Sequence, residues 1–270
     1  MMQHLRRSLS KAFGEPRSDL TILAGSFYIP KDKPSKPRGE DAHFYSEEAQ
    51  VIGVADGVGG CSSRGIDAGE YARELMSNAA KAVHGRHPAD VDPKDVLKDA
   101  FLKTGAPGSS TACIISIAGG RLRAANLGDS GFLVIRGGKT VYKSPAQLHG
   151  FNYPYQMGST SVSLPDEAEE MVMAVERGDI VIAGTDGLFD NLFPEDIEEA
   201  VKLYLKKESL PEVVAFALAR AARKKSMEKT TASPFAVAAY EAGVEHFGGK
   251  YDDITVVAAY VVVPDSLYLT

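Results

Sequence analysis

Four short segments rich in β-forming residues follow one another between residues 111 and 143. They are Thr111 to Ala118, Arg121 to Asn126, Phe132 to Ile135 and Thr140 to Lys143. Gly119-Gly120 separates the first two and Gly137-Gly138 the last two. Glycine pairs favour tight hairpin turns because glycine readily adopts positive φ. The pattern predicts an antiparallel meander, which argues against a doubly wound fold of alternating strands and helices.

The rest of the chain adds strands and helices on both sides of this meander. Further strands are expected at Leu20 to Ile29, Val51 to Ala55, Glu170 to Val175, Asp179 to Ala183 and Ile254 to Val263. Helices are expected at Ile66 to Val83, Pro93 to Lys103, Pro194 to Leu205, Leu210 to Lys225 and Ser233 to Gly243, with Asp92 as the N-cap of the second. Because strands and helices are segregated, we expect an α+β fold with two packed antiparallel sheets and helices outside them.

Composition permits such a core and excludes some partners. The 270 residues are 44% hydrophobic and 24% charged, which is enough for two packed sheets. The net charge is −6 and no basic tract dominates, so no nucleic-acid partner is expected. No apolar run approaches the roughly 18 residues that span a membrane. Cys61 and Cys113 have no metal-site or disulfide spacing, which favours a reducing compartment.

The first 19 residues differ from the rest. Basic residues precede the first acid, Glu15, and apolar residues recur at helical spacing. The basic residues are Arg6, Arg7 and Lys11, and the apolar ones are Met2, Leu5, Leu9 and Phe13. This composition is typical of an organelle transit peptide, the alternative being the plain N-terminal tail of a cytosolic protein.

Carboxylates stand next to the ends of several apolar strands. Asp56 follows Val51 to Ala55, Asp186 follows the run that ends at Ala183, and Asp129 follows the run that ends at Leu127. Asp252 and Asp253 precede the last strand, and Glu40 and Asp41 precede another short run. One such acid is usually only a turn residue, but several at strand ends repel one another unless cations compensate them. Hard divalent ions with oxygen ligands supply that compensation.

Other hydrolytic signatures are absent from the sequence. It contains no His-Glu-x-x-His, EF-hand loop, P-loop, Gly-x-Ser-x-Gly or Cys-x5-Arg motif. Hydrolysis would therefore use water activated by a metal ion and not a covalent enzyme nucleophile.

Six motifs, in order from about Gly39 to Val263, resemble those of the metal-dependent protein phosphatases of type 2C. The motifs are Gly39-Glu40-Asp41-Ala42-His43, Asp56-Gly57-Val58-Gly59-Gly60, Gly108-Ser109-Ser110-Thr111-Ala112, Asn126-Leu127-Gly128-Asp129-Ser130, Thr185-Asp186-Gly187-Leu188-Phe189-Asp190 and Asp252-Asp253-Ile254-Thr255-Val256. The segment from Gln147 to Gln156 resembles the branch of the mitochondrial T-cell-activation phosphatase 2C homologues. The resemblance implies a four-layer α-β-β-α sandwich over residues 20–265 as the catalytic domain, preceded by the transit peptide or tail at residues 1–19.

The same resemblance implies roles for the acids. Asp56 would bridge two Mn²⁺ or Mg²⁺ ions, the Gly57 carbonyl would bind one of them, and Asp186 and Asp252 would complete the other. A water bridging the ions would attack phosphorus. Glu40 and Asp41 would hold metal-bound waters. Asp129, with Thr111 and Asp190, would border a third, weaker metal position. Two simpler interpretations stay open: Asp129 as a hairpin-turn residue, and Asp190 as a cap for the helix near Pro194.

The chain departs from the family pattern at two places. Val58 stands where many members have a histidine proposed as general acid, so the proton would come from metal-bound water or, less directly, from His43. Lys36 stands where the phosphate-binding arginine is expected, and Arg38 lies two residues on. Either could contact phosphate, although lysine lacks the bidentate fork of arginine.

The sequence thus predicts a protein serine/threonine phosphatase that acts on phosphorylated proteins, as a monomer, in the mitochondrion, with plastid or cytoplasm as alternatives. A catalytically weak pseudophosphatase that serves as a binding or scaffold module is the rival interpretation. A different metal-dependent hydrolase using the same acids is a third.

Overall fold

Two five-stranded antiparallel sheets face each other in the computed structural model, which describes residues 20–59, 65–159, 161 and 163–264. The first sheet has the order β1 (Thr21–Ile29), β14 (Ile254–Val262), β13 (Ile180–Gly184), β7 (Gly131–Arg136) and β8 (Lys139–Lys143). The second has the order β12 (Glu169–Ala174), β6 (Arg121–Leu127), β5 (Ala112–Ala118), β3 (Val51–Asp56) and β2 (Asp41–Ser46).

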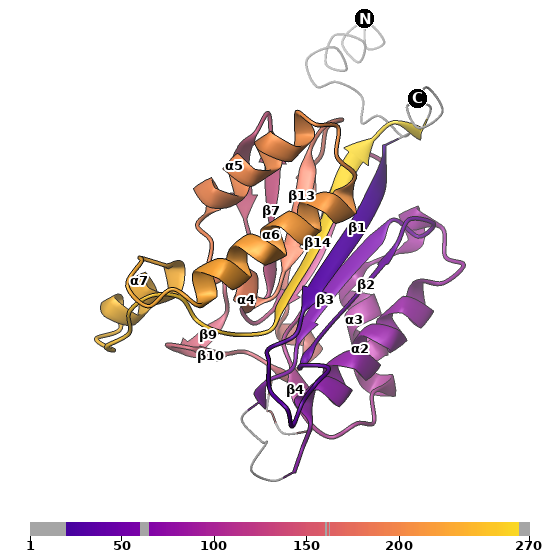
Figure 1. Ribbon diagram of the computed structural model, residues 1–270. Helices are drawn as coiled ribbons and strands as arrows, with labels where there is room; N and C mark the ends of the chain where they lie inside the picture. The colour runs from indigo at the N-terminus through magenta and orange to yellow at the C-terminus, as the bar shows by residue number, and fades with distance from the viewer. Residues whose placement is uncertain (1–19, 60–64, 160, 162, 265–270) are drawn as a thin grey trace, which may run out of the picture.

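Helices cover the outer faces of both sheets (Figure 1). Those on the second sheet are α2 (Ala68–Val83) and α3 (Pro93–Lys103), and those on the first are α5 (Pro194–Leu205) and α6 (Pro211–Ser226). The short α4 (Asp186–Phe189) follows β13, and α7 (Pro234–Glu241) lies beside the loop that leads into β14. The predicted α+β fold, a four-layer α-β-β-α sandwich, is therefore confirmed.

Most predicted elements are present to within a few residues, and the differences have local causes. The first helix begins at Ala68 and not at Ile66, because the Asp67 carboxylate caps it by accepting from the Gly69 N–H at 3.0 Å. Strand β2 was not predicted, because its sequence mixes polar and apolar residues without regular alternation. Neither were α4 and four short strands, which are β4 (Ser109–Ser110), β9 (Leu148–Gly150), β10 (Tyr153–Pro154) and β11 (Met157–Gly158).

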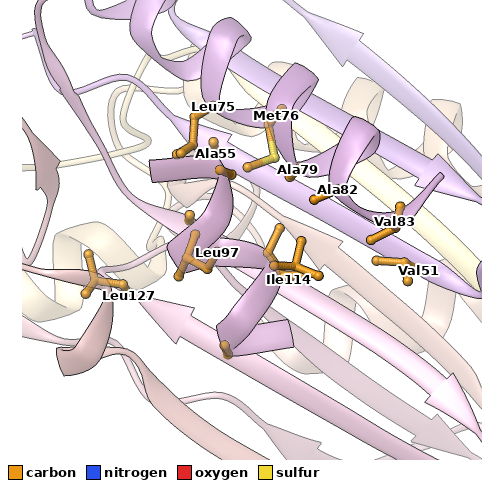
Figure 2. Packing of buried hydrophobic residues seen from close by; sticks show 14 of the residues in the cluster. Val51, Ala55, Leu75, Met76, Ala79, Ala82, Val83, Leu97, Ile114 and Leu127 are labelled. Atoms are coloured by element: carbon orange, nitrogen blue, oxygen red, sulfur yellow. The ribbon is translucent and has the colours of Figure 1, made fainter. Parts of the chain in front are cut away.

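Three apolar layers hold the four structural layers together. Between the second sheet and its helices, Leu75 and Leu97 pack near Ile114 (Figure 2). The next residue, Ile115, faces the other way into the layer between the two sheets. Both faces of β5 are therefore buried, which explains why its sequence is apolar except for Ser116. Among the described residues, no helix is long and apolar enough to cross a membrane.

The N-cap of α3 yields a first prediction. The Asp92 carboxylate accepts hydrogen bonds from the N–H groups of Lys94 at 2.9 Å and Asp95 at 3.2 Å. We expect Asp92→Ala to lower the free energy of unfolding by about 1 kcal/mol, measured by urea denaturation. Asp92→Asn is the control, because asparagine caps helices as well as aspartate does. Equal urea midpoints for the alanine variant and the parent protein would contradict the capping role.

Strand direction brings distant acids to one edge of the sandwich. In an antiparallel pair, the end of one strand lies beside the start of its neighbour. Asp41 at the start of β2 is accordingly paired with Asp56 at the end of β3. In the same way, the end of β13 lies beside the start of β14, which places Asp186 near Asp252. The edge is therefore shared by acids from both sheets.

Candidate active site

An acid-lined cavity of about 570 Å³ opens at this edge. The predicted site residues that border it are Glu40, Asp56, Gly57, Asp129, Asp186 and Asp252. Three lysines that the sequence interpretation did not single out, Lys31, Lys33 and Lys250, border it as well. The structure thus brings together side chains as far apart in the chain as Lys31 and Asp252, which are separated by 221 positions.

Burial, reinforced by mutual repulsion, raises the pKa of several acids at the cavity. Burial raises the pKa of Asp56 well above its ordinary value, and the charges of Asp186, Asp41 and Asp252 raise it further. Burial and the charge of Asp186 likewise raise the pKa of Asp129. Such shifts mean that the ionised carboxylates are poorly compensated within the protein, so the cluster favours an added cation.

Backbone contacts fix Asp56 and Gly57 at the mouth of the cavity. The Asp56 N–H donates to Thr111 Oγ1 at 3.2 Å, and the Thr111 N–H donates to the Asp56 carbonyl at 2.9 Å. The Gly57 N–H donates to the Glu40 carbonyl at 3.1 Å. A Cβ at Gly57 would lie 2.6 Å from the Ala68 carbonyl oxygen, so only glycine fits there. Thr111 therefore positions Asp56 from behind and does not itself border the cavity.

Asp41 is buried and also lies outside the rim of the cavity. Its Oδ2 accepts hydrogen bonds from Thr185 Oγ1 at 2.7 Å and Thr255 Oγ1 at 2.8 Å. Burial and the charge of Asp253 raise its pKa. Thr255 belongs to β14 of the first sheet, Thr185 is the N-cap residue of α4 directly after β13, and Asp41 begins β2 of the second sheet. These bonds therefore link the two halves of the sandwich directly behind the site.

Asp253, the neighbour of the predicted ligand Asp252, orders the loop that carries Glu40. Its carboxylate accepts from the Tyr28 hydroxyl at 2.8 Å, the Lys31 N–H at 2.8 Å and the Glu40 N–H at 3.2 Å. Burial and the charges of Asp41 and Asp253 raise the pKa of Tyr28. Tyr28 is therefore a neutral donor, and Asp253 has a structural role that the motif alone did not reveal.

Lys250 has the most ion pairs with the predicted site acids of the cavity residues that the sequence interpretation did not single out. Its Nζ forms ion pairs with Asp186, with Asp190 at 2.8 Å and with Asp252 at 3.5 Å. Burial disfavours the ionised form of Asp186, but attraction to Lys250 outweighs it and lowers the Asp186 pKa. The available signal was a lysine two residues before a motif aspartate, in the segment that leads into a buried strand.

Asp190 does not cap the helix at Pro194, so that interpretation is wrong. Phe193 is the N-cap residue of α5, and Asp196 accepts from the Phe193 N–H at 2.9 Å. Asp190 instead ends α4 and pairs with Lys250. Burial raises its pKa to about 7 despite the attraction of Lys250.

The predicted phosphate-binding residues lie beside the acid-lined cavity but do not border it. Lys36 pairs with the Glu40 carboxylate. Arg38 borders a separate cavity together with His43 and Tyr28. Burial lowers the pKa of His43. Contact of Lys36 or Arg38 with phosphate stays a prediction.

The residues present fit divalent cations. Asp41 Oδ1, Asp129 Oδ1 and Asp186 Oδ1 are buried and have no hydrogen-bond partner in the structure. Carboxylate oxygens without partners are the donors that Mg²⁺ and Mn²⁺ prefer. As the side chains stand, no three acidic, histidine or cysteine residues in the described ranges are arranged to hold an ion. Lys250 Nζ lies against two of the predicted ligands, Asp186 and Asp252.

Some predicted positions fall outside the described residues. They are residues 1–19, Gly60 and Cys61. Cys113 is a buried free cysteine of the apolar layer between the sheets.

Known proteins with related sequences decide the family. The chain is 40% identical to "Protein phosphatase PTC7 homolog fig" of Drosophila virilis over 85% of its own length and 80% of that protein. This chain belongs to the protein phosphatase 2C family. It is also 47% identical to "Probable protein phosphatase 2C 55" of Arabidopsis thaliana. That match covers 90% of this phosphatase 2C chain and 52% of the plant protein. A comparison with protein-family models finds no match.

Solved structures agree with this assignment. The photosystem II phosphatase PBCP matches 90% of this phosphatase 2C chain and 99% of its own, with a TM-score of 0.81 and 31% identity. The catalytic domain of the phosphatase PstP, in complex with two manganese ions, matches with a TM-score of 0.62 and 18% identity, which shows the fold alone. The chain spans 52 to 59% of the length of three plant phosphatase 2C relatives that it matches.

Proposed function

We propose that this phosphatase 2C chain hydrolyses phosphoserine and phosphothreonine in proteins, with two Mn²⁺ or Mg²⁺ ions. The observation that carries the proposal is the convergence of Asp56, Asp129, Asp186 and Asp252 on one cavity. Carboxylates that raise one another's pKa values in this way match the requirement of a divalent metal centre. The structure of PstP with two manganese ions supports manganese as a cofactor.

Each acid has a role that its position supports. Asp56 and the Gly57 carbonyl would hold one ion. Asp56 would also hold the other ion, together with Asp186 and Asp252. Asp129 would hold a third ion more weakly. Glu40, Asp41, Asp190 and Thr111 would keep these ligands in place. When bound there, the divalent ions would activate water for attack on phosphorus and offset the charge of the phosphate.

The lysines at the cavity would complement the ions. Lys31 and Lys33 border the acid-lined cavity from one side, so their charges attract a phosphate group toward it. Val58 borders the cavity and has no ionisable group, while His43 borders a different one. The leaving serine oxygen would therefore take its proton from water in the cavity.

A second, apolar cavity supports a polypeptide substrate. It has a volume of about 460 Å³ and shares Asp129 and Asn152 with the acid-lined cavity. Its apolar rim includes Leu148, Phe151 and Phe235. If the phosphate of a phosphopeptide lies at the acids, the residues next to the phosphorylated one would lie against this apolar surface. Small phosphorylated metabolites would leave it uncovered.

The direct test compares substrates and metals. We expect the purified protein to hydrolyse phosphoserine and phosphothreonine peptides with Mn²⁺ or Mg²⁺ and to lose this activity in EDTA, as followed by phosphate release. Nucleotides and phosphodiesters are the comparison substrates. A preference for these would point to a different metal-dependent hydrolase. No turnover on any of them with metal present would favour the pseudophosphatase alternative.

Location and assembly stay predictions. We propose mitochondrial localisation on the composition of residues 1–19 and the relation to the PTC7 homologue. The likeness to a photosystem II phosphatase supports the plastid alternative. A fluorescent protein fused behind the first 19 residues distinguishes mitochondrion, plastid and cytoplasm. Light scattering of the purified chain tests the expected monomer.

A further inference from the structure

Lys250 places a positive charge inside the acid cluster. Its ammonium contacts Asp186, Asp190 and Asp252, and only 15% of the side chain is exposed. It also lies 5.2 Å from the centre of the Phe235 ring, a cation–π contact. Three carboxylates and an aromatic face thus surround one cation.

The backbone holds Lys250 in this place. Its N–H donates to Asn191 Oδ1 at 3.0 Å, and Asn191 Nδ2 donates to the Lys250 carbonyl at 2.9 Å. The same Nδ2 donates to the Gly187 carbonyl at 2.9 Å in α4. Asn191 therefore ties the Lys250 backbone to the short helix that begins with Asp186, so the ammonium stays within reach of the cluster.

We propose that Lys250 is a built-in competitor for one of the two metal ions. The inference rests on the proposed role of Asp186 and Asp252 as ligands of that ion. An ammonium paired with both carboxylates occupies their oxygens, and its charge repels an arriving divalent ion at short range. The ion can bind only when the ammonium leaves these two acids.

Asp190 can keep an ion pair with the Lys250 ammonium after the ammonium leaves Asp186 and Asp252. It contacts Lys250 Nζ at 2.8 Å and is not one of the proposed ligands of the two main ions. The flexible four-carbon stem of lysine allows the ammonium to shift from Asp186 and Asp252 toward Asp190. Lys250 therefore weakens binding at the Asp186–Asp252 position without blocking it, and leaves the position at Asp56 and Gly57 less affected.

Lys31 provides a matched control. Its ammonium pairs with Asp252 at 3.3 Å, and 38% of its side chain is exposed. Removal of the Lys31 charge should change the affinity for Mn²⁺ less than removal of the Lys250 charge does. Water screens the exposed Lys31 pair, and the Lys31 ammonium need not be displaced from Asp186.

Calorimetric titration with Mn²⁺ tests the competition. Lys250→Met should bind the weaker of the two ions at least about tenfold more tightly than the parent protein, because a short-range repulsion is removed. Lys250→Arg keeps the charge, so its Mn²⁺ dissociation constants should stay within about threefold of those of the parent. The same holds for Lys31→Met.

Thermal melting supplies a second readout that does not depend on activity. In EDTA, Lys250→Met should melt at a lower temperature than the parent, because its carboxylates lose their internal counter-charge. With Mn²⁺, the rise in melting temperature should be larger for the variant than for the parent, because tighter binding stabilises the fold more. If Lys250→Met does not fold without metal, Lys250→Gln tests the same loss of charge while it still donates hydrogen bonds.

The outcomes separate this inference from the proposed function. If the parent binds two Mn²⁺ ions and the methionine and glutamine variants bind them equally or more weakly, the competition is refuted and the metal centre stands. If neither the parent nor the variants bind Mn²⁺, the metal centre itself fails, and the competition fails with it.

Discussion

Asp56→Asn should lower kcat/KM for a phosphoserine peptide by at least about 1000-fold, which corresponds to about 4 kcal/mol of transition-state stabilisation. Asparagine keeps the shape of the side chain but removes the charge and one carboxylate oxygen. Asp56 lies among acids from both halves of the sandwich, so we expect that no neighbour can take over its proposed role as a metal ligand. Phosphate release in the presence of excess Mn²⁺ measures the effect.

The same variant should be more stable than the parent in EDTA. Because burial and neighbouring acids raise the pKa of Asp56, its ionisation destabilises the metal-free fold as the pH rises above the ordinary carboxyl range. Asparagine cannot ionise, so the melting temperature at neutral pH should rise by about 2–4 °C for each kcal/mol of repulsion relieved. Asp92→Asn, remote from the site, should change neither activity nor melting temperature. Full activity of Asp56→Asn would refute the proposed site.

Gly187→Ala should damage both fold and activity. A Cβ at Gly187 would lie 1.8 Å from the Asp253 carbonyl oxygen and 2.9 Å from its carbonyl carbon, so backbone must move. That movement separates α4, which carries Asp186, from the segment that carries Asp252. We expect a loss of about 3 kcal/mol in the free energy of unfolding and about a 100-fold loss in kcat/KM.

Urea denaturation and phosphate release measure these two effects. Gly105→Ala is the matched control, because no heavy atom lies within 4 Å of a Cβ placed there. It should leave stability within about 0.5 kcal/mol of the parent. A Gly187→Ala variant as stable and active as the control would show that α4 and the Asp253 segment can separate without cost.

The sequence predicted the elements whose burial is extreme. Strands such as β5 and β14 are apolar on both faces, so their residues form nearly unbroken runs between turn signals. The cap at Asp92 and the glycine pairs before β6 and β8 marked boundaries through local backbone chemistry. Such signals depend on nearest neighbours in the chain, which is why they could be recognised without tertiary information.

The site was only partly predictable for the opposite reason. The motifs named the acids that meet at the cavity, but Lys250 gains its importance from Asp186 and Asp190, about 60 positions earlier. The position of Arg38 at a separate cavity likewise depends on the path of the loop before β2. Tertiary contacts of this kind leave no periodic trace in the sequence.

The hydrogen bonds from Thr185 and Thr255 to Asp41 have a consequence for how the protein tolerates change. Asp56 ends a strand of one sheet, and Asp186 begins α4 directly after a strand of the other, so the proposed site residues are divided between two halves whose interface is filled mainly by apolar side chains. Apolar packing holds the two sheets together, but it is not directional and fixes their relative alignment only weakly. The buried hydrogen bonds to Asp41 are directional and fix that alignment. A substitution of Thr185 or Thr255 should therefore allow the two sheets to shift relative to each other. We expect it to lower the catalytic rate more than it lowers the melting temperature.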